Sequence, residues 1–140
     1  MKKMILLLGV MLSCVAFAGY EQDVLKKMTP IEERIEEENY GLGSSNASMF
    51  INLQKLRGLW KSEMEKVYKV YSSKLSQSEK VKLDKEQKNV EVKVKNFEKE
   101  VKEDFGGGNG VGIATEEGVI EIYKKRTLEL AKRYDKLNKK

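Results

Sequence analysis

Few side chains in this sequence could perform chemistry. The chain has no histidine and a single cysteine, Cys14, which lies in an apolar N-terminal stretch. The commonest zinc ligands and the thiol nucleophile are therefore scarce. Carboxylates are abundant, but they are scattered among lysines at helical spacing, which is typical of surface ion pairs, and no D-x-D-x-D-G calcium loop occurs. We expect no enzymatic activity, no metal site and no cofactor.

Two polar residues stand out because each interrupts an otherwise apolar helical stripe: Gln87 and Arg126. A polar group at such a position needs hydrogen-bond partners. We expect the two side chains to bond between helices, to each other or to Tyr68, in a structural role. Direct contact with a ligand is the alternative.

The N-terminus has the three parts of an export signal. A basic start is followed by an apolar stretch over residues 4–15 and by Ala16-Phe17-Ala18, an A-x-A cleavage site. We expect residues 1–18 to be a signal peptide cut between Ala18 and Gly19, which places the mature protein in the periplasm or outside the cell. The apolar stretch falls short of the roughly 20 residues of a membrane span. The alternative is a lipoprotein with its lipid on Cys14.

Charge limits the class of partner. The full chain has 27 basic and 22 acidic residues, and cleavage would remove two lysines and no acid, leaving a net charge of +3. Acids and bases alternate along every segment, so nucleic-acid binding is not expected. The acidic stretch from Glu32 to Glu38 is predicted to be a solvated helix face, with a local binding patch as the alternative.

Apolar spacing predicts an all-α protein. Residues 20–28 form a lead-in, and Thr29 with Pro30 predicts a helix start that runs to Tyr40. Residues 46–74 and 77–101 carry apolar residues three or four apart, and Ser76 with Glu79 forms a capping box between them. Gly-rich residues 106–110 favour a turn, since they lack the ending of a phosphate-binding loop. A last helix is predicted from Thr115 to about residue 137.

These elements predict a long antiparallel helical hairpin, with its two stripes facing each other, and shorter N-terminal and C-terminal helices in a small bundle. We expect an N-terminal helical segment and loop over residues 19–45 and a helical domain over residues 46–140. With no cysteine in the mature chain, the apolar seams alone must hold the fold together.

The order of motifs from about residue 60 to residue 137 resembles the lysozyme inhibitor LprI-like N-terminal domain family of small secreted bacterial proteins. That family has a tyrosine-bearing helix, a leucine-rich link, a leucine followed four residues later by glutamine, a Gly-Gly turn and a final Arg-Thr-Leu helix. Val90 stands where the family usually has tryptophan, and its cysteines are absent. The matching positions are Tyr68, Leu75, Leu83, Gln87, residues 106–108, Arg126, Thr127, Leu128 and Leu130.

The resemblance implies an all-helical envelope protein and inhibition of lysozyme, the enzyme that cuts peptidoglycan. We expect a secreted binding protein for lysozyme or another cell-wall hydrolase that acts by steric block. The loops carrying Gly43 and Ser44, and Gly107 and Asn109, are the expected contact sites. The alternative is a structural or adhesive envelope protein that forms homo-oligomers through leftover apolar surface at Phe50, Val81 and Val92.

Overall fold

The computed structural model describes residues 19–108 and 110–139, and these contain four helices and no strand: α2 (Tyr20–Tyr40), α3 (Asn46–Ser72), α4 (Gln77–Phe105) and α5 (Gly110–Asn138). The predicted all-α class is confirmed. The predicted signal peptide, with Cys14 and Ala18, and the loop residue Asn109 lie outside the described residues. No described helix combines the length and the apolarity that crossing a membrane requires.

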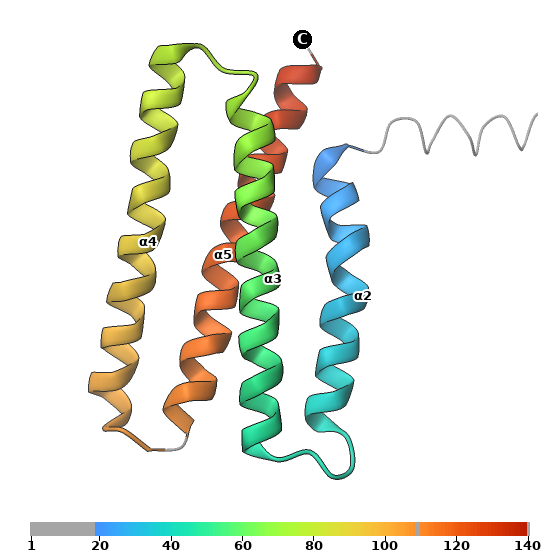
Figure 1. The fold of residues 1–140 in the computed structure, drawn as a ribbon, viewed down its shortest axis with the longest axis vertical. Coiled ribbons are helices and arrows are strands. Elements are labelled where there is room, and N and C mark those ends of the chain that lie inside the picture. The colour runs from blue at the N-terminus through green and yellow to red at the C-terminus, as the bar shows by residue number, and fades with distance from the viewer. Residues whose placement is uncertain (1–18, 109, 140) are drawn as a thin grey trace, which may run out of the picture.

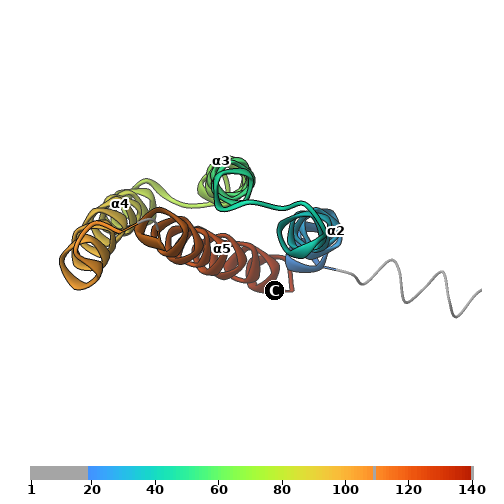
Figure 2. The ribbon, with the colours of Figure 1, turned by 90° about the horizontal axis from the view of Figure 1, so that it is seen from below.

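The four helices run side by side in alternating directions, and α5 holds the central position (Figures 1 and 2). Its most extensive packing is with α3, and it also packs against α4 and α2, while α2 packs on α3. The short 73–76 link connects α3 to α4, which run in opposite directions (Figure 1). The expectation that their two stripes face each other needs correction, because the close backbone packing of both helices is with α5.

The buried residues match the predicted stripes. Trp60, Met64 and Val67 of α3 are almost completely buried, and Leu83, Val90, Val94 and Val101 are the buried residues of α4. Each large apolar side chain buried in this way contributes about 1.5–3 kcal/mol. Val24 and Met28 of α2 join the same core cluster, so residues 19–45 share one core with residues 46–140.

Capping side chains mark the predicted helix starts. Ser45 accepts a hydrogen bond from the Ser48 backbone N–H and begins α3, and Ser76 and Glu79 form a reciprocal capping box that begins α4. Gly106 ends α4 with φ of 62°, in the left-handed region that glycine adopts without steric cost. These starts and stops confirm the sequence prediction.

Two predicted boundaries are wrong. Helix α2 continues through Pro30, so Thr29 is not a cap. Proline costs the helix one hydrogen bond, but Val24 and Met28, each 1% exposed, anchor the turns before it. Helix α5 begins at Gly110 rather than Thr115, because the partly buried Ile113 packs against the core from within the helix.

Candidate functional site

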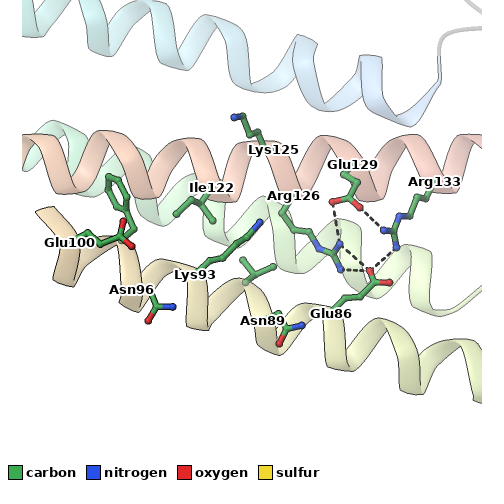
Figure 3. A pocket seen from close by; sticks show the side chains of 12 residues that line it. Glu86, Asn89, Lys93, Asn96, Glu100, Ile122, Lys125, Arg126, Glu129 and Arg133 are labelled. Atoms are coloured by element: carbon green, nitrogen blue, oxygen red, sulfur yellow. Dashed lines mark hydrogen bonds and ion pairs between the residues drawn. The ribbon is translucent and has the colours of Figure 1, made fainter.

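An open groove of about 770 Å³ lies between α4 and α5. Apolar and charged side chains from both helices and two asparagines from α4 line this groove (Figure 3). The lining residues are Glu86, Asn89, Val90, Lys93, Asn96, Phe97, Glu100, Ile122, Lys125, Arg126, Glu129 and Arg133.

Arg126 is the most deeply buried cation of this groove, with 8% of its side chain exposed. Its Nε donates to Gln87 Oε1 at 3.1 Å, so the predicted contact between these two residues is confirmed. Its terminal nitrogens donate to Glu86 and Glu129 at 3.2 Å. Arg133 donates to the same two carboxylates at 2.7 and 2.5 Å. Two cations therefore meet two anions in a closed network, visible as dashed lines in Figure 3.

This network neutralises its own charges. Partial burial opposes the charged form of Glu86, yet hydrogen bonds from Arg133 and Arg126 together hold the pKa of Glu86 below its usual value. Because every guanidinium faces a carboxylate, the groups join α4 to α5 and leave little charge for a ligand. Leu83 and Leu130, the apolar signature positions, are 2% and 0% exposed and belong to the core.

Tyr68 does not reach Gln87 or Arg126. Its hydroxyl donates to Asp84 on α4, and this hydrogen bond, with partial burial, raises the pKa of Tyr68 to about 12. The bond links α3 to α4 at the surface. The tyrosine is partly buried and packs against the core.

A second groove, of about 370 Å³, lies between α2, α3 and α5 and has an acidic lining. Lys124 from α5 donates to Glu32 at 2.9 Å and lies 5.6 Å from the centre of the Trp60 ring. The Trp60 indole N–H also donates to Glu32, at 2.9 Å. The remaining acids of the groove form no ion pair within the described ranges, and they are Glu36, Glu117 and Glu121.

Charge is distributed unevenly among the helices around this second groove. Helix α2 has seven acidic and three basic residues, and five of the acids lie between Glu32 and Glu38 with Arg34 as the single base. Helix α3, beside it, has five basic and two acidic residues. The C-terminal half of α2 and the first turns of α5 therefore form one acidic face, which we call the acidic end.

The α2–α3 loop borders the acidic end. Tyr40 lines the acidic groove and is 72% exposed, and Leu42 is completely exposed. Gly43 and Ser44 follow in the same loop and are exposed as well. The other predicted contact loop, with the exposed Gly107, lies at the same end of the molecule (Figure 1). The fold thus brings the two predicted loops to one end.

A partly buried group of ion pairs joins α3, α4 and α5, and it has no clear sequence signal. Arg57 of α3 donates to Glu98 of α4 at 2.8 Å and to Glu116 of α5 at 3.2 Å. Glu116 is 6% exposed, and its Oε2 has no hydrogen-bond partner among the described residues. Only the position of Glu116 in the first turns of an amphipathic helix could have suggested an inward-facing carboxylate.

No group of three or more potential metal ligands occurs within residues 19–108 and 110–139. Comparison with known proteins returned no matching family model, no matching curated protein and no matching solved structure.

Proposed function

We propose that this chain is an exported, non-enzymatic binding protein whose acidic end binds a basic protein, with lysozyme or another cell-wall hydrolase as the partner. One observation carries the proposal. Glu36, Glu117 and Glu121 of the acidic groove form no ion pair among the described residues, the exposed Tyr40 lines the same groove, and the exposed Leu42 follows two residues later.

The combination of charge and apolar surface suits a protein partner. An exposed aromatic and a leucine supply the apolar contacts that dominate binding energy at interfaces. The surrounding carboxylates attract a basic partner and orient it during encounter. A mature net charge of +3 would repel a basic enzyme at long range, but α2 alone has a net charge of −4. At a Debye length of about 8 Å in physiological salt, the local face governs the approach.

The proposed mechanism is steric. The loop that follows α2 projects Leu42 from the end of a helical scaffold, and a segment of this kind blocks an enzyme cleft without chemistry. Kinship with the LprI-like family is part of this proposal. It is supported by the hydrogen bond between Gln87 and Arg126, two polar positions of the family pattern.

The test is digestion of bacterial cell walls by lysozyme in the presence of the chain that begins at Gly19. We expect micromolar protein to slow the digestion. Glu36→Lys with Glu37→Lys should abolish the effect, since both residues are exposed on α2. The matched control, Glu65→Lys with Glu100→Lys, makes the same change in net charge at exposed positions on α3 and α4. Equal inhibition by both double variants would refute the assignment of the acidic end.

A structural envelope role is the second candidate, and one observation favours it. Val81 and Val92 of α4 are 59% and 53% exposed and lie three helical turns apart on one face. Lys85 and Lys88 lie between them on that face, which shortens the apolar surface available to a second copy. Light scattering tests this candidate: a concentration-dependent oligomer without inhibition of lysozyme would favour it over the first.

A further inference from the structure

The first turn of α2 is capped from another helix. Gly19 occupies the N-cap position and has no side chain to accept hydrogen bonds from the helix start. Asp135, near the end of α5, takes this role. Its Oδ1 accepts from the Tyr20 N–H at 2.7 Å and its Oδ2 accepts from the Glu21 N–H at 3.1 Å. A carboxylate at this place also suits the positive end of the helix dipole.

Asp135 packs closely against Gly19. A Cβ added at position 19 would come within 2.5 Å of Asp135 Oδ2 and 2.8 Å of Asp135 Cγ, closer than such atoms pack. The φ of Gly19 is −79°, so the constraint at this position is close approach and not an unusual backbone angle. A larger residue here would require the Asp135 carboxylate, which accepts the two hydrogen bonds from Tyr20 and Glu21, to shift.

The Gly19 nitrogen lies near the same carboxylate. Since N and Cβ of one residue are about 2.5 Å apart, the 2.5 Å approach to Oδ2 places this nitrogen within about 5 Å of that oxygen. An ionised carboxylate has about four lone-pair directions, and the Tyr20 and Glu21 N–H groups use two of them. Room for a further donor remains.

We infer that Asp135 is a binding site for the α-ammonium group that cleavage between Ala18 and Gly19 creates. While that peptide bond is intact, position 19 carries a neutral amide. Cleavage replaces the amide with a cation beside a partly buried carboxylate, and an opposite charge at this distance interacts favourably. Processing thus adds an ion pair that fastens α2 to α5. The inference rests on the proposed export.

Other contacts at this end hold the two helices in register for such a pair. The rings of Tyr20 and Tyr134 meet edge to face, with their centres 5.3 Å apart. Lys132 Nζ lies 3.9 Å from Glu21 Oε1. Cleavage between Ala18 and Gly19 alters none of these side chains, so the amine is the group that processing changes.

The experiment has two parts. The intact mass of the protein exported by a bacterial host gives the first mature residue, which we expect to be Gly19. Thermal unfolding is then measured for four chains beginning at Gly19: with a free or an acetylated amine, each with Asp135 or with Asp135→Asn. We expect acetylation to lower the Tm by about 2–4 °C with Asp135 present, and to have no effect in the Asp135→Asn background, because the cycle isolates the pairwise interaction.

The outcomes are distinct. Equal Tm values for the free and acetylated chains with native Asp135 would overturn the inference, even if Asp135→Asn proved too unstable to measure. An equal fall in Tm on acetylation with Asp135 and with Asp135→Asn would also overturn the inference. A mature protein that begins at another residue would also overturn the inference, because no free amine would then form at Gly19. Neither unfolding result depends on binding of lysozyme, so failure here and failure of the proposed function are separable.

Discussion

Replacing Arg126 with alanine tests the polar link between α4 and α5. The guanidinium donates to Gln87, Glu86 and Glu129, and 8% of the side chain is exposed. Hydrogen bonds to charged groups contribute about 1.5–3 kcal/mol when well formed. The two glutamates remain 43% and 46% exposed, so water can solvate them after the change. The loss of stability therefore stays below the 3–5 kcal/mol, roughly, that breaking a fully buried ion pair costs.

We expect Arg126→Ala to lower the free energy of unfolding by about 2–3 kcal/mol. For a domain of this size that corresponds to a fall in Tm of about 10 °C. The assay is thermal unfolding followed by circular dichroism at 222 nm. Arg126→Met retains much of the apolar stem, so it separates lost packing from lost polar contacts. The control is Lys125→Ala. Lys125 directly precedes Arg126 and is exposed, so this change should alter stability by less than about 0.5 kcal/mol.

The loss should also depend on pH. The pKa of Glu86 is depressed in the folded chain, since its bonds to Arg133 and Arg126 outweigh the opposing effect of burial. A carboxylate whose pKa is lowered by folding contributes its full stabilisation above its ordinary pKa, 4.5 for Glu86. This contribution is lost as the pH falls through the pKa that the group has in the folded chain. The difference in free energy of unfolding between the native chain and Arg126→Ala should therefore narrow when the pH falls below the pKa of Glu86 in the folded chain. A Tm within about 2 °C of the native value at pH 7 would refute the reasoning.

Two further predictions concern local packing and the α3–α4 link. A Cβ at Gly118 would overlap the Phe97 ring, so Gly118→Ala should destabilise the fold by about 1–2 kcal/mol. Gly58 lies in open space, so Gly58→Ala should stabilise the fold by about 0.5 kcal/mol. Urea unfolding of both variants measures the difference in stability, and equal effects would contradict the prediction. Tyr68 should titrate near pH 12, and Asp84→Ala should return its pKa toward 10.0; tyrosine absorbance during an alkaline titration reports the shift, and an unchanged curve would contradict it.

The sequence predicted the parts of the fold that depend on local chemistry. Apolar residues three or four apart marked the buried faces of α3 and α4, and Ser76 with Glu79 marked a helix start through its capping geometry. Gln87 and Arg126 were identifiable as partners because a polar residue in an apolar stripe needs one.

The errors came from long-range packing. A proline normally begins a helix, but burial of Val24 and Met28 extends α2 ten residues before Pro30. The central position of α5 was not predictable, because several helices have an apolar face and sequence alone does not rank them. Charged residues at helical spacing look alike whether solvated or paired. The contacts of Arg57 and of Glu32 with other helices were therefore invisible in the sequence.

The affinity of the chain for lysozyme, measured by titration calorimetry at two salt concentrations, tests the central claim most directly. We predict micromolar binding at low salt that weakens as salt rises, because the acidic end provides the attraction. Glu36→Lys with Glu37→Lys should weaken it at least about tenfold, equivalent to about 1.4 kcal/mol. Glu65→Lys with Glu100→Lys should leave it nearly unchanged. No detectable binding, or equal weakening by both double variants, would contradict the account.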